Sequence, residues 1–120
     1  NEIGFGSSVF AGSVEILRCC VGTRNAHKVL LSGKMFSAEE AQEIGLIDER
    51  VFAENLIPRA AEKACEFANT DLTAFGSIKR LLRAPYIERI ALREATSLRE
   101  FIDIWYSEST WKKLQLIRIN

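Results

Sequence analysis

Apolar side chains return every three or four positions through the second half of the chain, which is the spacing of one face of a helix. Residues 56–68 have this spacing throughout, and Pro58 is tolerated near the start because first-turn amides lack helical partners. The stripe consists of Leu56, Ile57, Ala60, Ala61, Ala64, Cys65 and Ala68. Asn69, Thr70 and Asp71 then break the pattern, and we expect them to cap the helix that follows.

Three further helices are predicted beyond this break. The first begins at Leu72 and ends before Pro85, because proline lacks an amide proton and clashes with the preceding turn. The second and longest covers about 87–107, and the last covers about 109–119. Their apolar faces exceed what two short strands could bury, so we expect these helices to pack on each other and on a partner surface.

The beginning of the chain mixes strand, loop and helix signals. Residues 1–12 are glycine-rich and apolar, which predicts a short strand followed by a loop. Residues 13–20 are expected to form one or two helical turns. Asn25 is expected to cap a separate helix that runs through Leu31.

Two helix stops and one capped helix follow in close order. Gly33 is placed to end a helix, because glycine readily adopts the positive φ that is needed after the last turn. Ser37 and Glu40 have the spacing of a capping box, which predicts a short helix that starts there. Gly45 ends that helix, and residues 46–52 are typical of a short strand. The chain is therefore predicted to be mostly α-helical with one or two short strands.

Composition narrows the classes of function. The chain has 120 residues, of which 48% are hydrophobic and 27% charged, and its formal net charge is zero. A neutral chain without a basic face argues against nucleic-acid binding, and no apolar run approaches the length of a membrane span. Three cysteines, two of them adjacent, are a poor disulfide framework and fit a reducing compartment. The single histidine, His27, has no metal-ligand spacing around it.

The segment from Leu31 to Asp48 also resembles the signature of the crotonase superfamily, the enoyl-CoA hydratases and isomerases. In that family a stretch of the form tGr-xx-sAeeAxxxGLvdxvv follows the acyl-CoA pocket. The resemblance implies an α/β crotonase-like spiral for the whole domain, of which residues 1–120 would be the C-terminal half. Residues of about 1–52 would form the pocket loop, helices and strand, and about 56–120 the helical, oligomerising region.

The same resemblance implies partners and a compartment. The substrate would be an acyl-CoA thioester, with coenzyme A as part of the substrate and no further cofactor or metal. The missing N-terminal half of the domain would be a partner, and the assembly would be a homotrimer or a hexamer. The location would be the cytoplasm, or the mitochondrial or peroxisomal matrix.

Glu2 is the first candidate for catalysis. The segment from Asn1 to Gly6 resembles the family's PEi-xxG segment, in which the glutamate is an acid/base residue, although Asn1 replaces the usual proline. A thioester acidifies its α-protons, and burial would raise the pKa of the carboxyl toward the working pH. The alternative is a solvated glutamate at the end of the chain.

Glu15 is the second candidate, since it matches a position in the family's GGTQRL segment that is usually glutamine. The alternative, a charge on a helix surface, is favoured for this residue. The preceding loop, residues 9–13, lacks the proline and two glycines of the family's P-G-A-G-G loop and contains Phe10. This departure changes the expected pocket shape and leans toward isomerisation. The substrate-binding candidates from this region are Gly4, Phe5, Gly6, Phe10 and Gly12.

The remaining candidates carry weaker signals. Lys79 matches a lysine that is common on this helix in the family, and its alternative is a solvated lysine. We interpret His27 as a surface residue, Cys19 and Cys20 as packed small side chains, and the two tryptophans, Trp105 and Trp111, as core or interface anchors.

The resemblance implies an enoyl-CoA hydratase or a Δ3-Δ2-enoyl-CoA isomerase that works through an enolate, with Glu2 as acid/base. The two backbone amides that polarise the thioester carbonyl, and the second glutamate of hydratases, belong to the half of the family's domain that precedes Asn1. This chain on its own is therefore not expected to be active. The alternative is a non-catalytic helical assembly module derived from such a half.

Overall fold

The computed structural model describes residues 2–116, and its elements are helical. In chain order they are η1 (Glu2–Phe5), α1 (Ala11–Ser32), α2 (Ala38–Glu43), η2 (Ala53–Asn55), α3 (Leu56–Ala68), α4 (Leu72–Trp105) and α5 (Glu108–Leu114). The last predicted helix is shorter than expected, and the part of that prediction beyond residue 116 lies outside the described residues.

The two predicted strands are wrong, because residues 2–116 contain no strand. The first segment forms the 3-10 helix η1, in which the Gly6 and Ser7 amides bond back to Ile3 and Glu2 carbonyls at 3.1 and 3.0 Å. The second segment begins as a helix end: the amide of Leu46 bonds to the carbonyl of Ala41 at 2.8 Å. Both segments therefore satisfy their first amides locally, as turns do.

The helix stops between residues 33 and 45 are confirmed. Gly33 follows α1 with a φ of 62°, and Gly45 follows α2 with a φ of 76°. The Ser37 side chain accepts from the amide of Glu40, and the Glu40 carboxylate accepts from the amide of Ser37. Two donors at the start of α2 are satisfied reciprocally, as the capping-box spacing predicts.

The α1 helix includes both of the helical segments that the sequence predicts as separate, residues 13–20 and the segment from Asn25 to Leu31. It extends from residue 11 to residue 32, but Gly22 has φ 73° and ψ 166°, which is not helical. The helix is therefore kinked at Gly22. The predicted start of a separate helix at Asn25 lies three residues after this kink, inside α1. Only glycine adopts such a conformation readily.

The prediction that a helix ends before Pro85 is wrong, since α4 continues through this residue for 34 residues in total. A proline inside a helix leaves the carbonyl four residues earlier without its donor. That residue is Leu81, which is exposed, so water can take the place of the lost donor. The helix end at Asn69–Asp71 is confirmed, because the Asp71 carboxylate accepts from the amide of Ala74 at 2.7 Å.

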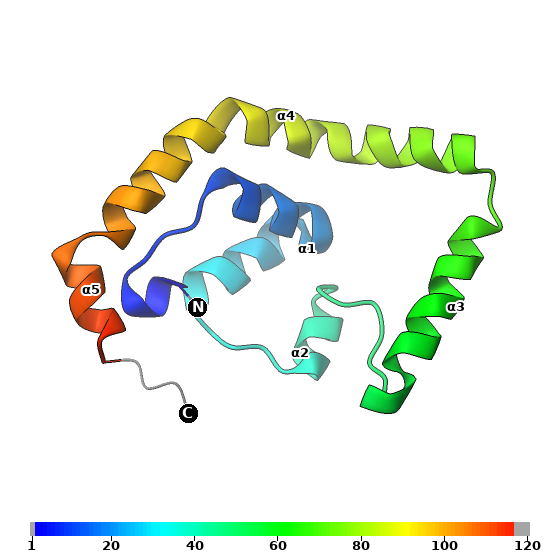
Figure 1. The fold of residues 1–120 in the computed structure, drawn as a ribbon, viewed down its shortest axis with the longest axis horizontal. Helices are drawn as coiled ribbons and strands as arrows, with labels where there is room; N and C mark the ends of the chain where they lie inside the picture. Colours follow the sequence, from blue (N-terminus) through cyan, green and yellow to red (C-terminus); the bar gives the residue numbers. More distant parts are fainter. Residues whose placement is uncertain (1, 117–120) are drawn as a thin grey trace.

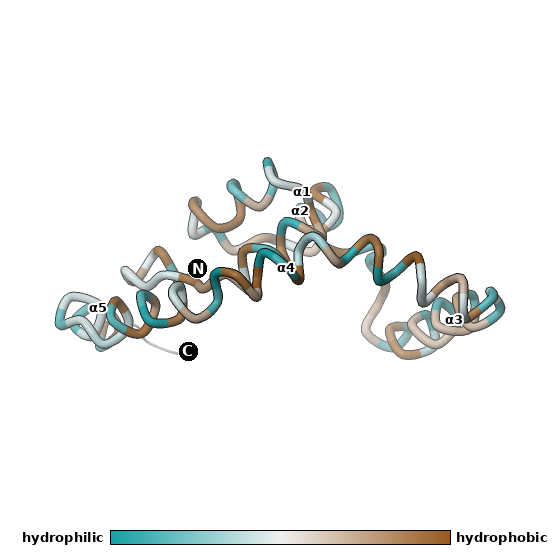
Figure 2. Tube along the Cα trace, turned by 90° about the horizontal axis from the view of Figure 1, so that it is seen from above, coloured by the Kyte–Doolittle hydropathy of each residue, from teal (hydrophilic) through white to brown (hydrophobic). Residues whose placement is uncertain are grey.

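The α4 helix organises the molecule. Figure 1 shows it as a long arm, with α1 packed beneath its later half, α5 folded back toward η1, and α3 hanging from its beginning. Figure 2, seen from above, places α3 at the end of the molecule opposite α5. The molecule is accordingly flat and elongated, with extents of 52 × 38 × 22 Å.

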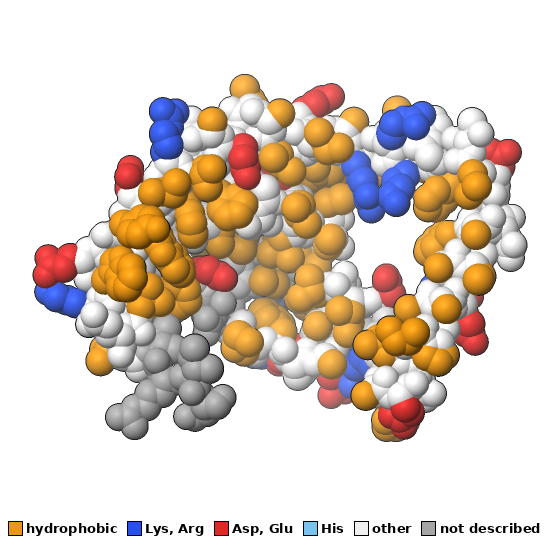
Figure 3. Space-filling model, in the orientation of Figure 1, with side chains coloured by type: hydrophobic (Ala, Val, Ile, Leu, Met, Phe, Trp, Pro, Cys, Tyr) orange, Lys and Arg blue, Asp and Glu red, His pale blue; other side chains and the backbone are white. Residues whose placement is uncertain are grey.

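The buried core is small. Its apolar members are Ala11, Val21, Ala26 and Ala41. Large apolar side chains of α3 and the beginning of α4 are exposed, and Figure 3 shows them gathered along both helices. They include Leu56, Ile57, Phe67, Leu72, Ile78, Leu81 and Leu82. The expectation that these helices need a further surface to cover them agrees with this exposure. None of the described helices has both the length and the apolar character to cross a membrane.

Candidate functional site

Glu2 lies at a pocket of about 360 Å³ formed by η1, the following loop and α1. Most of the walls are aliphatic, and two serines and one histidine contribute polar groups. The lining consists of Glu2, Ile3, Ser7, Ser8, Val9, Val14, His27, Leu30 and Leu31. The volume and apolar lining are within the range of small-molecule sites.

The carboxyl of Glu2 is exposed, and its pKa is lowered chiefly by a hydrogen bond from its own backbone amide. Burial acts to raise this pKa but is outweighed, so the expectation that the pKa of Glu2 is raised toward the working pH is wrong. Glu2 is therefore ionised near neutral pH and can accept a hydrogen bond or a proton from a bound molecule, and its lowered pKa makes it a weaker base than a buried carboxylate.

His27 lines the same pocket, a position that the sequence pattern around it does not predict. The residue is exposed, as expected, but it shares a helix face with Leu30 and Leu31, three and four positions later. This spacing along α1 is the signal that could have placed it beside the apolar wall.

Phe5 and Phe10 face α4. The ring of Phe5 meets Trp105 edge to face with 6.0 Å between centroids, and Phe10 meets Phe101 in the same way at 5.6 Å. Phe101 and Trp105 stack at 5.7 Å, which completes an aromatic cluster. Trp105 is thus a packing anchor, as the sequence predicts, while Trp111 is 46% exposed.

Two of the candidate glycines are close to side chains of α4 and α5. The amide of Gly12 donates to Oε2 of Glu94 at 2.8 Å, and a Cβ on Gly12 would lie 3.2 Å from Oε1. The carbonyl of Gly6 accepts from Oγ1 of Thr110 at 2.9 Å, and a Cβ on Gly6 would lie 2.8 Å from Nζ of Lys113. Contacts within the protein therefore account for glycine at both positions, and substrate-binding roles for Gly4, Gly6 and Gly12 stay predictions.

Glu15 is buried, so the favoured expectation of a surface charge is wrong. Only 2% of the residue is exposed, and its two carboxylate oxygens accept from Arg89 at 2.7 Å and Arg18 at 2.9 Å. Burial, the largest single influence, would raise the pKa of Glu15, but the hydrogen bonds and charges of the two arginines together outweigh it and lower the pKa. A carboxylate engaged on both oxygens is arranged to hold helices together.

Lys79 belongs to a different pocket. It is exposed, and its ammonium lies 5.4 Å from the ring centroid of Phe75. The pocket, of about 550 Å³, is lined by Cys19, Phe67, Phe75, Ile78, Lys79, Leu82, Arg83 and Tyr86. Cys19 and Cys20 are exposed, which contradicts the expectation that they are packed. The structure therefore does not bring Lys79 to the pocket that Glu2 lines.

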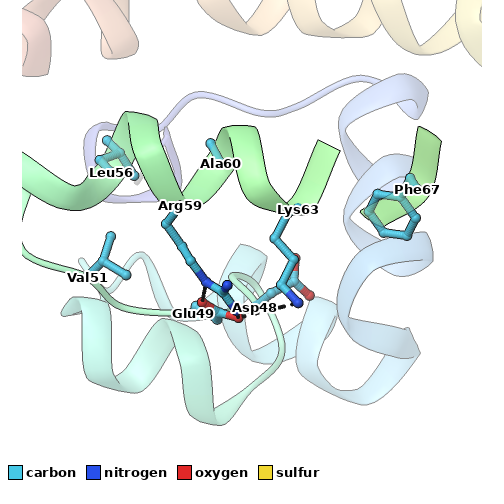
Figure 4. A pocket seen from close by; sticks show the side chains of 8 residues that line it. All are labelled: Asp48, Glu49, Val51, Leu56, Arg59, Ala60, Lys63 and Phe67. Atoms are coloured by element: carbon cyan, nitrogen blue, oxygen red, sulfur yellow. Dashed lines mark hydrogen bonds and ion pairs between the residues drawn. The ribbon is translucent and has the colours of Figure 1, made fainter. Parts of the chain in front are cut away.

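A third pocket, of about 480 Å³, lies between α3 and the loop that precedes η2 (Figure 4). Arg59 donates to both oxygens of Glu49 at 2.7 Å, and Nζ of Lys63 lies 3.8 Å from the same carboxylate. Arg59 also pairs with Glu62, and Lys63 with Glu66. The cations here are paired with the chain's own carboxylates, so an anionic ligand would have to compete with those carboxylates. Within residues 2–116, no three metal-ligating side chains are placed to share an ion.

Comparisons with known proteins agree on one family. Residues 1–110 match the profile of the enoyl-CoA hydratase/isomerase family. The chain is 31% identical over 84 residues to a protein assigned as enoyl-CoA hydratase echA17 in Mycobacterium avium, and to its counterpart in Mycolicibacterium paratuberculosis. Each alignment covers 70% of this chain and 33% of the relative.

Two solved structures share the fold. Human mitochondrial delta3-delta2-enoyl-CoA isomerase superposes with a TM-score of 0.86 at 22% identity, over 97% of this chain and 45% of the isomerase. A protein assigned as an enoyl-CoA hydratase/isomerase in Acinetobacter baumannii gives a TM-score of 0.75 at 22% identity, over 92% and 46%. The chain spans about a third of the length of the curated relatives and less than half of the solved ones.

Proposed function

Because this chain belongs to the enoyl-CoA hydratase/isomerase family, we propose that it supplies the acid/base side of an acyl-CoA site, with Glu2 as the proton-transferring residue. The observation that carries the proposal is the position of Glu2 at the edge of an aliphatic pocket. An acyl chain would contact the aliphatic wall, and the thioester α-carbon would lie at the carboxylate.

The chemistry needs a base that can take a proton from the α-carbon side and return it. A carboxylate that is ionised at neutral pH can accept the proton, and its conjugate acid can deliver it to another carbon of the resulting dienolate. The developing negative charge on the thioester oxygen needs hydrogen-bond donors. In the resembled family these are backbone amides of the preceding half of the domain, so we propose that a segment corresponding to that half completes the site.

Isomerisation suits this chain's own residues better than hydration. Hydration uses two carboxylates to position and split a water molecule, whereas movement of a double bond needs a single base. The second glutamate of a hydratase would belong to the preceding half of the domain, so the carboxylates of this chain do not decide between the two reactions. The loop of residues 9–13 lacks the proline and two glycines of the family's P-G-A-G-G loop, and this departure leans toward isomerisation. A Δ3-Δ2-enoyl-CoA isomerase is therefore the finer proposal.

A second candidate function is a helical assembly module without catalysis. It is favoured by the exposed apolar side chains of α3 and the beginning of α4, which a partner would cover. The same surface would serve a trimer or hexamer of an active enzyme. The two functions therefore differ in turnover rather than in assembly.

The test is turnover of crotonyl-CoA, which is hydrated, and of 3-hexenoyl-CoA, which is isomerised, by the purified protein. Intact mass and peptide sequencing would first identify any segment that accompanies the chain ahead of Asn1. Glu2→Gln should lower turnover about 100-fold or more, because it removes the proton acceptor. Glu54→Gln is the matched control, since Glu54 is exposed on η2 and should leave turnover unchanged.

The outcome decides between the candidates. Activity on 3-hexenoyl-CoA that depends on Glu2 supports the isomerase, and activity on crotonyl-CoA supports the hydratase. A stable oligomer that turns over neither substrate, even together with a segment that corresponds to the preceding half of the domain, contradicts catalysis and favours the assembly module.

A further inference from the structure

The later half of α4 meets the beginning of the chain in an antiparallel series of contacts. As residue numbers rise from 5 to 15, their partners on α4 fall from 105 to 89. The pairs are Phe5 with Trp105, Phe10 with Phe101, Ala11 with Ser97, Gly12 with Glu94, and Glu15 with Arg89. We call this series the α1–α4 ladder.

Two hydrogen bonds of the α1–α4 ladder, from the amides of Ala11 and Gly12, cap the start of α1. Phe10 occupies the N-cap position and provides no side-chain hydrogen bond. Instead, the amide of Ala11 donates to Oγ of Ser97 at 2.9 Å, and the amide of Gly12 donates to Oε2 of Glu94 at 2.8 Å. A carboxylate at a helix N-terminus is also favoured by the helix dipole.

The backbone that Glu94 holds belongs to the wall of the pocket. Ser7, Ser8 and Val9 line the pocket before Gly12, and Val14 lines it two residues after. Glu94 itself does not line the pocket, so it supports this wall from behind. The Glu94 carboxylate lies close to the Gly12 backbone, because a Cβ on Gly12 would be only 3.2 Å from Oε1 of Glu94.

We propose that Glu94 is a positioning residue that fixes the segment of residues 7–14, which lines the same pocket as Glu2, an inference that rests on the proposed function. The carboxylate acts through the Gly12 amide rather than on a substrate. Loss of the contact frees the first turn of α1, and the wall then no longer presents a bound acyl group to Glu2 in one geometry. Misplacement of reacting groups by about 1 Å can cost about 100-fold in rate.

The experiment compares Glu94→Ala, Glu94→Gln and Asp71→Ala with the wild type. Glutamine has the same length and keeps an oxygen that accepts from the Gly12 amide, so it should retain the positioning contact. Asp71→Ala removes the cap at the opposite end of α4 and lowers stability without touching the wall. The measurements are kcat and KM on the substrate that the wild type uses, Tm, and hydrogen exchange at residues 11–14.

We expect Glu94→Ala to lower kcat about tenfold or more and to accelerate exchange at residues 11–14. Glu94→Gln should stay within about threefold of the wild-type kcat, because the acceptor is kept. Asp71→Ala should lower Tm with kcat unchanged. This combination separates positioning from a loss of stability.

Two results would overturn the positioning role alone: a Glu94→Ala protein with wild-type kcat despite faster exchange, or equal losses of kcat in Glu94→Ala and Asp71→Ala. Wild-type protein that uses neither substrate overturns the proposed function, whereas unchanged exchange at residues 11–14 in Glu94→Ala overturns the positioning contact itself. The exchange data distinguish the cases, since they report whether Glu94 holds the wall in the absence of any turnover.

Discussion

Glu15 and Arg89 are 74 positions apart in the sequence, and their side chains meet at 2.7 Å. The contact joins the first turns of α1 to the middle of α4. Since Glu15 is 2% exposed and Arg18 occupies its other oxygen at 2.9 Å, the carboxylate is compensated on both sides. The pair therefore ties together the two helices that form the centre of the molecule.

Replacing Arg89 with alanine should destabilise the protein by about 2 kcal/mol. Breaking a fully buried ion pair typically costs roughly 3–5 kcal/mol, because the remaining charge is left buried. The cost is smaller here because the Arg89 side chain is 34% exposed and Arg18 still faces Glu15. Urea unfolding measures the change, and Arg93→Ala, an exposed arginine of the same helix, is the control. Equal effects of the two substitutions would contradict the role of the pair.

The same pair predicts an acid sensitivity. Burial favours a raised pKa for Glu15, but its two arginines outweigh burial and lower it, so the folded state binds this proton more weakly than the unfolded chain. The resulting stabilisation is complete above the unfolded pKa of about 4.3 and is lost as pH falls through the folded value. Urea midpoints between about pH 6 and pH 3 should fall for the wild type.

Glu15→Gln should remove part of this slope, because glutamine does not titrate. Glu2, Glu40 and Glu49 also have lowered pKa values and contribute to the slope in the same direction. An identical pH slope in Glu15→Gln and the wild type would show that the pair is not formed in solution.

Alanine at Gly22 and at Gly76 should change stability in opposite directions. A Cβ at Gly22 would meet nothing within 4 Å, so space does not forbid it. The backbone conformation opposes the substitution instead, because Gly22 has φ 73° and ψ 166°. It costs a residue with a side chain about 1–3 kcal/mol to adopt such dihedral angles.

Gly76 lies inside α4, and its nearest neighbour to a Cβ is Nη1 of Arg80 at 3.8 Å. Alanine there should stabilise the protein by about 0.5–1 kcal/mol, through a higher helix propensity. Urea midpoints of the two variants check both signs. Destabilisation by Gly76→Ala, or none by Gly22→Ala, would argue against the kink as described.

Thr110→Val should cost about 1–2 kcal/mol, although the side chains have nearly the same shape. Thr110 is 1% exposed, and its Oγ1 donates to the carbonyl of Gly6 at 2.9 Å. Valine leaves that carbonyl without its donor. Thr70→Val is the control, because Oγ1 of Thr70 also bonds a carbonyl, that of Phe67 at 2.7 Å, but at an exposed site where water can replace it. Thermal unfolding of both variants makes the comparison.

The helix ends and caps between residues 33 and 45 were predictable because they depend only on neighbouring residues. A glycine with positive φ at Gly33 and Gly45, and the reciprocal caps of Ser37 and Glu40, need no distant partner. The prediction of a strand at residues 46–52 was wrong because a strand needs a neighbouring strand to pair with, which a local pattern does not reveal. The Leu46 amide donates to the carbonyl of Ala41 instead.

The candidate site was predictable only in part. The position of Glu2 at a pocket follows from its motif, whereas the environment of Glu15 depends on α4 covering it, which no pattern in residues 13–20 reveals. The sequence likewise does not indicate that Phe101 contacts Phe10 or that Glu94 contacts Gly12, and substrate-binding roles for Phe10 and Gly12 stay predictions. Contacts of this kind are set by tertiary packing, which overrides what neighbouring residues suggest.

The α1–α4 ladder has a consequence for how the chain folds. Its hydrogen bonds and the Thr110–Gly6 contact join residues 74 to 104 positions apart, so none of them can form before a long loop has closed. Closing such loops costs chain entropy before any contact repays it. An all-helical set of elements would ordinarily fold quickly from local contacts, but here we expect the helices to form first and the ladder to close last. Folding should therefore be slower than helix content alone suggests, with the pocket wall among the last parts to become ordered.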